Sequence, residues 1–304
     1  MKKQAQIEKR ALLIGSMIYL IMGSFGWYTH YISKSEAMLL EGNYNMVNAL
    51  ASLIGYYVVQ IRHRKTETFP LGQFVYESLY ALIKGILILG ILTAALWENS
   101  VKIYDYFKYS VVHQVNKDPI VYMVILSVLL SFFLAYFYHY SNKQTGNSST
   151  MLATDKKAAL IDGYLSIFGG GSLLLMIYIG QNFNGLEFLQ YIGDALVVLI
   201  FEIIMIREPF KIIKENFVEL AGGQLQSDKD CEFISHVVKK DPMNGFNIIN
   251  NYITKVGSMY VVTIFINPID NCVSMQEISV YRRRLMKILG ARYNNLTIEI
   301  VLNN

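Results

Sequence analysis

Six long apolar segments constrain this chain more than any other feature of its sequence. A helix needs about 20 predominantly apolar residues to cross a bilayer, and six stretches reach that length. They are residues 12–31, 37–60, 74–97, 119–140, 151–179 and 188–206. With 53% hydrophobic and only 16% charged residues, the chain is too apolar for an ordinary soluble domain. We therefore predict a membrane protein with six transmembrane α-helices.

Basic residues set the expected orientation, because cytoplasmic loops carry an excess of Lys and Arg. The basic clusters at one set of segment ends are Lys2, Lys3, Lys9, Arg10, Arg62, Arg64, Lys65, Arg207, Lys211 and Lys214. The loop expected at 102–118 departs from the rule, with three lysines against two aspartates. On balance we expect both termini in the cytoplasm, and the compact chain favours a bacterial inner membrane.

The chain changes character near residue 221, after which we expect a small soluble domain. Residues 227–239 are typical of an N-capped helix, and 274–289 begin with the capping box Ser-Met-Gln-Glu. Three β-rich stretches are typical of strands: residues 246–256, 259–266 and 296–302. The order α-β-β-α-β predicts helices on one face of a three-stranded sheet. The expected domains are therefore 1–221 in the membrane and 222–304 outside it.

Several classes of function find no support in the sequence. The net charge of +4 comes from basic residues at segment ends, so it indicates topology and not nucleic-acid binding. Cys231 and Cys272 lie far apart, with neither a disulfide framework nor a CxxC metal spacing. The tail has no GxxxxGK[ST] or GxGxxG motif, and the five histidines are scattered. We predict a protein that is not an enzyme and that holds no tightly bound cofactor.

Polar residues line one face of two apolar segments. Residues three, four, seven and eleven positions apart share a helix face. The two stripes are Glu41, Tyr44, Asn45, Asn48 and Ser52 in the second segment, and Asp155, Ala158, Asp162 and Ser166 in the fifth. An ionisable group in a bilayer persists mainly where it faces a bundle interior or a watery path. Oxygen donors of this kind are hard ligands that suit Mg, Mn, Ca or alkali ions.

Some of these residues have an equally good structural interpretation. Asn45, Asn48 and Ser52 could hydrogen-bond across helices as packing contacts. Tyr44 could belong to an aromatic belt at the membrane interface. Asp162 lies about two turns inside its segment, so that for this residue the functional interpretation is favoured.

The remaining ionisable groups of the apolar segments leave more alternatives open. Glu41 and Asp155 lie nearer segment ends and could simply be hydrated. Lys156 and Lys157 could extend to the cytoplasmic surface, or one of them could pair with a carboxylate and take the place of a cation. No role is assigned to the two carboxylates of the sixth segment, Asp194 and Glu202.

Short motifs in four places have counterparts in a known family. They are residues 69–77 (FPLGQFVYE), similar to HP[YF]GH-x-x-x-E, residues 97–100 (WENS), similar to an E-S helix end, residues 41–48 (EGNYNMVN), similar to DG-x-HS-x-x-D, and residues 158–162 (AALID), similar to H-x-x-x-D. Together they resemble the cation diffusion facilitator family of metal/proton antiporters, over nearly the whole chain. The tail is similar to the family's cytoplasmic αββαβ domain, a ferredoxin-like fold that pairs two subunits.

The resemblance places the family's four-ligand transport site on two pairs of residues, Tyr44 with Asn48 and Ala158 with Asp162. Only Asp162 is an expected ligand, because Ala158 has no donor and Asn48 is neutral. The family's loop histidines are replaced by Phe69 and Gln73, and its tail histidines are also missing. A chain with all three metal positions altered is a divergent member, which moves a different ion or none.

The main hypothesis is a homodimeric exporter that exchanges a divalent metal such as Zn, Mn or Fe for protons by alternating access. The ion would bind an oxygen-rich site formed by Asp162, Tyr44, Asn48, Asn45, Glu41 and Asp155. The alternative is a transport-inactive relative that acts as a structural or regulatory membrane partner.

Overall fold

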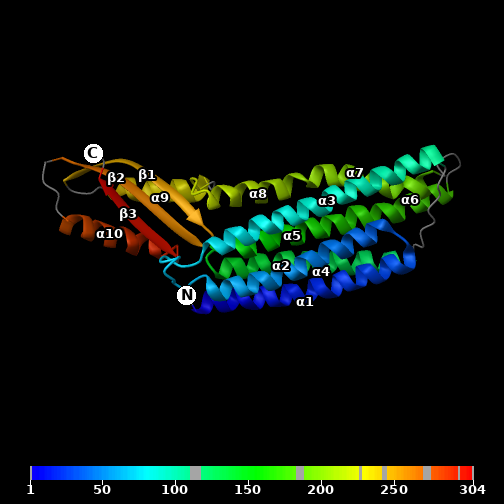
Figure 1. Cartoon of the computed structure of the whole chain (residues 1–304), viewed down its shortest axis with the longest axis horizontal. Helices are drawn as coiled ribbons and strands as arrows, with labels where there is room; N and C mark the ends of the chain where they lie inside the picture. Colours follow the sequence, from blue (N-terminus) through cyan, green and yellow to red (C-terminus); the bar gives the residue numbers. More distant parts are fainter. Residues whose placement is uncertain are drawn as a thin grey trace.

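The computed structural model describes residues 2–109, 118–182, 188–225, 228–241, 245–269, 275–293 and 295–302. Within these residues the molecule is elongated: long helices form a bundle, and a small three-stranded sheet with helices lies at one end of it (Figure 1). Helix α1 begins at the same end (Figure 1). We call it the sheet end of the bundle.

The bundle contains the helices of the apolar segments and one more that follows them. They are α1 (Lys2–Ser33), α2 (Glu36–Ile61), α3 (Val75–Tyr109), α4 (Asp118–Gln144), α5 (Thr150–Leu165), the π-helical turn η1 (Ser166–Gly170), α6 (Gly171–Asn182), α7 (Leu189–Met205) and α8 (Arg207–Leu220). In the part of the chain that is described, four helical stretches are long and apolar enough to cross a membrane: Gln4–Ser33, Val75–Tyr109, Asp118–Gln144 and Thr150–Met176.

Helices α2 and α7 cover the other two predicted segments but are not among these four. Helix α7 has 17 residues, which is short for a span. Helix α2 has 26 residues, and its polar residues reduce its hydropathy. Four spans are therefore supported by length and composition, fewer than the six that the sequence suggests.

Two details differ from the sequence-based expectation. The third helix continues to Tyr109, so that the first half of the loop expected at 102–118 is helical, while residues 110–117 lie outside the described part. The fifth segment is not one uniform α-helix, because η1 separates α5 from α6. Here Gly170 allows close packing on α4, since a Cβ at that position would lie 2.0 Å from Val124 Cγ2.

The C-terminal part has the predicted order of elements. It consists of α9 (Asp228–Lys240), β1 (Phe246–Val256), β2 (Met259–Pro268), α10 (Met275–Gly290) and β3 (Leu296–Leu302). Strand β2 is central, antiparallel to β1 and parallel to β3. The core is formed by the inner face of this sheet, Ile234 and Val238 of α9, and Leu285 and Leu289 of α10. The predicted caps at residues 227 and 274 lie outside the described residues.

The turn between β1 and β2 joins the sheet to the bundle. Gly257 has φ +59°, and its N–H donates to Ser78 Oγ of α3 at 2.7 Å. Its carbonyl accepts from Thr150 Oγ1, at the start of α5, at 2.9 Å. A Cβ on Gly257 would lie 2.4 Å from the Phe74 carbonyl oxygen. The close approach of this turn therefore requires glycine.

A buried ion-pair network lies directly beneath this turn. Arg62, just after α2, contacts Glu77 Oε1 at 2.6 Å and Glu8 Oε2 at 2.5 Å, and all three side chains have no exposed surface. Ser258 Oγ donates to the same Glu77 oxygen at 3.2 Å. Beside it, burial lowers the pKa of Lys255, but Glu219, Tyr260 and Glu77 together outweigh burial and raise the pKa overall. The sheet thus contacts the bundle through charged groups.

Candidate functional site

The polar stripe of α2 faces the interior of the bundle. Four of its members have no exposed surface, and Glu41 is 4% exposed. The spacing of three and four residues places them on one side of the helix, and that side packs against α1, α3 and α5. The interior position predicted for this stripe is thereby observed.

Glu41 and Asp162 meet across the interface between α2 and α5. Ser166 Oγ lies within hydrogen-bond distance of Glu41 Oε1, at 2.8 Å, and of the Asp162 backbone oxygen, at 3.0 Å. Ser131 Oγ of α4 donates to Asp162 Oδ2. Ser166 thus links the Glu41 carboxylate to the backbone of α5 at Asp162. We call Glu41 and Asp162 the carboxylate pair.

No basic side chain of the described part of the chain forms an ion pair with either member of the carboxylate pair. Their partners are hydroxyl and amide groups, and Asn45 lies beside Asp162. A buried charge without a counter-charge is costly. Two such groups linked through one serine therefore favour protons or a bound cation beside them.

The described polar atoms around the carboxylate pair are oxygens or neutral amide nitrogens. Asn45 Nδ2 donates to the Glu41 carbonyl at 3.0 Å, which leaves Asn45 Oδ1 without a hydrogen-bond partner among the described residues. Both amide atoms of Asn48 and Asp162 Oδ1 also lack a well-formed hydrogen bond there. Carboxylate and amide oxygens of this kind are ligands for hard cations.

A π-helical turn accompanies the contacts of Ser166 with the Glu41 carboxylate and with the Asp162 backbone oxygen. The turn begins at Ser166, one helical turn after Asp162, and such π-turns are frequent at functional sites. Its formation is consistent with the three successive glycines Gly169, Gly170 and Gly171, since glycine weakens a regular helix. The glycine run was the signal in the sequence for this irregularity.

Tyr44 lies on the same stripe but makes a backbone contact. Its hydroxyl donates to the carbonyl of Ala158 at 2.9 Å, and the residue is fully buried. The interfacial-belt interpretation of Tyr44 therefore does not hold. The contact ties α2 to α5 one turn from Asp162.

Asp155 has different neighbours from the carboxylate pair. Its Oδ1 forms a buried ion pair with Lys84 of α3 and accepts a hydrogen bond from Tyr80 Oη at 2.8 Å. Sequence reasoning missed Lys84, although it is the only basic residue among residues 74–97. The structure thus groups Glu41 with Asp162 and places Asp155 with Lys84.

The two lysines that follow Asp155 do not approach the carboxylate pair. Lys157 Nζ pairs with Glu215 Oε2 of α8 at 2.9 Å, with both side chains about one-third exposed. Lys156 Nζ lies 3.4 Å from His139 Nδ1 and is partly exposed. Neither lysine takes the place of a cation in the bundle. Glu202 of α7 is buried, and the side chain of Asp194 lies outside the description.

Within the described residues, no group of three or more His, Cys, Asp and Glu side chains is arranged to hold a metal ion. A metal at the carboxylate pair would therefore complete its coordination with hydroxyl, amide or water oxygens. Such a set suits Mn²⁺ or Mg²⁺ better than Zn²⁺, which prefers nitrogen, sulfur and carboxylate in a tetrahedron.

In the described part of the chain, apolar helices enclose two carboxylates without a basic partner, an arrangement typical of membrane proteins that handle cations. Residues 12–221 match the family described as the cation efflux transmembrane domain. The chain therefore belongs to the cation efflux family, whose members are membrane transporters and not enzymes. The family assignment that the resemblance suggested is confirmed by this match. The comparison with curated proteins gave no match.

Proposed function

We propose that this protein exports a divalent cation in exchange for protons, by alternating access around the carboxylate pair. The observation that carries the proposal is that Glu41 and Asp162 are both buried, are linked through the Ser166 hydroxyl and the Asp162 backbone oxygen, and have no described basic partner. Asn45 and Asn48 would add neutral oxygens, and Tyr44 would fix the distance between the two helices. Asp155 is left out of the ligand set because Lys84 already neutralises it.

Proton coupling follows from the same arrangement. Two buried carboxylates cannot both stay charged when the cation leaves, so they take up protons in its place. The cation and the protons therefore compete for one site, which is the requirement for exchange. Among Zn, Mn and Fe, the oxygen donors favour Mn²⁺.

The topology of this proposal has six crossings, with α2 and α7 added to the four apolar helices. Both termini and the αββαβ domain, residues 222–304, would lie in the cytoplasm. Such a domain would pair two subunits, and a bacterial inner membrane is the expected location. The basic segment ends and the family match support this arrangement.

The experiment is cation flux into proteoliposomes under an imposed proton gradient, with Zn, Mn, Fe, Co, Mg and alkali ions compared. We expect Mn²⁺ flux that Asp162→Asn and Glu41→Gln each abolish in a folded protein. The matched control is Glu208→Gln, which removes a carboxylate from α8 at a partly exposed position. Full flux in Asp162→Asn would show that the site is elsewhere.

One observation favours the second candidate, a transport-inactive partner protein. The site has only two ionisable ligands. The described residues contain no group of three or more His, Cys, Asp and Glu side chains that could hold a metal ion. Thermal unfolding with and without each cation separates the two functions, because a ligand that binds only the folded state raises its stability. A midpoint that no ion shifts would favour the partner role.

A further inference from the structure

A second group of buried polar side chains lies in the bundle, between the carboxylate pair and the sheet end. Its members come from five helices and are at most 5% exposed: Tyr19 of α1, Ser52 of α2, Tyr80 and Lys84 of α3, Tyr138 of α4, and Asp155 of α5. We call them the gate cluster. The proposed ion site uses none of these residues.

The ammonium group of Lys84 is the centre of this cluster. It forms the ion pair with Asp155 and lies 5.9 Å from the ring centroids of both Tyr19 and Tyr80. Tyr80 Oη donates to the same carboxylate oxygen. The tyrosine rings and the carboxylate thus provide a place for one positive charge, and Lys84 fills it.

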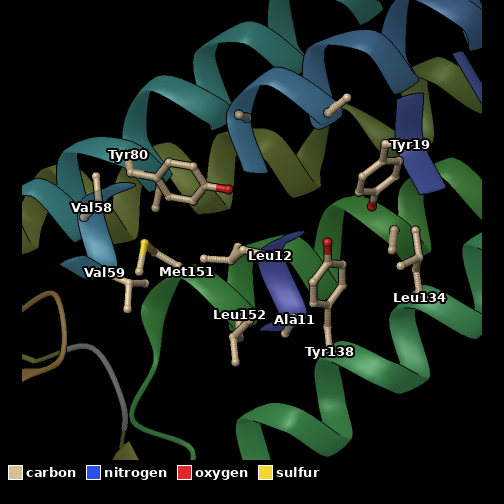
Figure 2. Close-up of a cluster of buried hydrophobic side chains, with 14 of the residues drawn as sticks. Ala11, Leu12, Tyr19, Val58, Val59, Tyr80, Leu134, Tyr138, Met151 and Leu152 are labelled. Atoms are coloured by element: carbon tan, nitrogen blue, oxygen red, sulfur yellow. The ribbon is translucent and has the colours of Figure 1, made fainter. Parts of the chain in front are cut away.

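Oxygen atoms remain unused around this charge. Among the described residues, Asp155 Oδ2, Tyr19 Oη, Tyr138 Oη and Ser52 Oγ have no well-formed hydrogen bond. Figure 2 shows the hydroxyls of Tyr19 and Tyr138 directed toward each other, with Tyr80 approaching from another side. An unsatisfied buried polar group costs about 1–3 kcal/mol. Several unsatisfied oxygens in one place indicate a site where a second cation could replace the lysine ammonium.

The gate cluster lies on the path that the proposed function requires. Asp155, Ala158 and Asp162 share one face of α5, and Asp155 is about 10 Å nearer the helix start by the helical rise. The start of α5, at Thr150, contacts the β1–β2 turn. A cation that enters from the sheet end along this face meets Asp155 before it meets Asp162.

We propose that the Lys84–Asp155 pair is the gate on the sheet side of the ion path, and that Lys84 acts as a tethered cation. Its ammonium occupies Asp155 while the path is closed. An arriving cation takes over Asp155 and the free oxygens of Tyr19, Tyr138 and Ser52, and Lys84 withdraws on its flexible stem. This inference rests on the proposed function, because it assumes an ion path that leads to the carboxylate pair.

Lys84 is therefore a positioning residue and not a ligand of the transported ion. Once Lys84 has returned to Asp155, its positive charge also excludes a second cation while the first is bound beyond the gate. A purely structural ion pair would have neither effect. The difference can be measured as access of a reagent to the space beyond the gate.

The test is thiol labelling of a single cysteine, Ala158→Cys, in a background with Cys231→Ser and Cys272→Ser. Ala158 is buried between Asp155 and Asp162, so that a charged, membrane-impermeant thiol reagent reaches it only through the gate. The readout is the labelling rate from the sheet side of oriented vesicles. The variant is Lys84→Met with Asp155→Asn, which removes both charges together and leaves no unpaired one.

We expect the double variant to label at least about tenfold faster than the parent, because loss of a charge-assisted hydrogen bond shifts an open–closed equilibrium by roughly that factor. Lys84→Arg keeps the pair and should label as slowly as the parent. Tyr80→Phe removes one hydrogen bond from Asp155 and no charge, and its rate should be intermediate. Parent-like labelling of the folded double variant would overturn the gate.

If the double variant does not fold, Tyr80→Phe decides the question, since a rate equal to the parent's would also overturn the proposal. The labelling does not depend on transport, so it separates two kinds of failure. An Asp162→Asn protein that still transports contradicts the proposed ion site. Unchanged labelling contradicts only the gate.

Discussion

Buried carboxylates have different partners at the sheet end and in the middle of the bundle. At the sheet end, Glu8 and Glu77 flank Arg62, and all three side chains are fully buried. In the middle, Glu41 and Asp162 contact only hydroxyl and amide groups among the described residues. The same residue type is thus neutralised by a fixed cation in one place and left without one in the other.

The contrast distinguishes carboxylates that hold helices together from the two that the proposed function uses. A carboxylate paired with an arginine cannot release its counter-charge, so it holds elements together. A carboxylate bordered by hydroxyls can exchange a cation for a proton without breaking a protein contact. Asp155 lies between these cases, because its partner Lys84 is charged but flexible.

The largest effect is expected for Arg62→Ala, which leaves Glu8 and Glu77 buried together without a cation. Removing one partner from a buried ion pair costs about 3–5 kcal/mol. The measurement is the chemical unfolding midpoint of the purified protein in detergent. The exposed neighbour Arg64→Ala should leave the midpoint unchanged. Equal midpoints for the two variants would contradict the structural role of Arg62.

Substitutions at Asp155 and Asp162 should affect the free energy of unfolding differently, because only Asp155→Asn should lower it. Asp155→Asn leaves Lys84 buried and unpaired and should lower the free energy of unfolding by about 3 kcal/mol. Asp162→Asn removes a carboxylate that has no basic partner among the described residues, so stability should stay the same or rise. Addition of Lys84→Met should restore most of the stability that Asp155→Asn loses. A loss in both single variants would mean that Asp162 also has a fixed counter-charge.

A smaller effect is expected at the contact between sheet and bundle. Gly257→Ala introduces a Cβ 2.4 Å from the Phe74 carbonyl oxygen at a positive φ. Gly222→Ala is the matched control, because it has φ +71° but no atom within 4 Å. Alanine at positive φ alone costs about 1 kcal/mol, and the clash should roughly double that loss. Limited proteolysis of the sheet domain would detect the undocking, and equal cleavage in both variants would argue against it.

The smallest effect is expected for Ser131→Ala, which removes one hydrogen bond from Asp162. A typical hydrogen bond contributes about 0.5–1.5 kcal/mol to the state it favours. Because Ser131 stabilises the charged form of Asp162, cation affinity should fall about tenfold while the fold is kept. Isothermal titration with Mn²⁺ would measure the affinity. Ser100→Ala, on the exposed side of α3, serves as the control.

The sequence determined the elements of this protein. The apolar segments predict the helices, and the tail predicts α9, β1, β2, α10 and β3 in the observed order. The three-and-four spacing of the α2 stripe also predicts that its polar residues share one buried face. These features depend on the spacing of apolar and polar residues along the chain, which the sequence shows directly.

Only the tertiary structure decided which carboxylates are neutralised. Lys84 and Asp155 are 71 positions apart in the sequence, and Ser166 and Glu41 are 125 apart. The pairing depends on how α2, α3 and α5 rotate against one another, because a hydrogen bond requires its atoms within about 3 Å. The periodicity of a helix shows which face is polar, but the charge across from that face belongs to another helix.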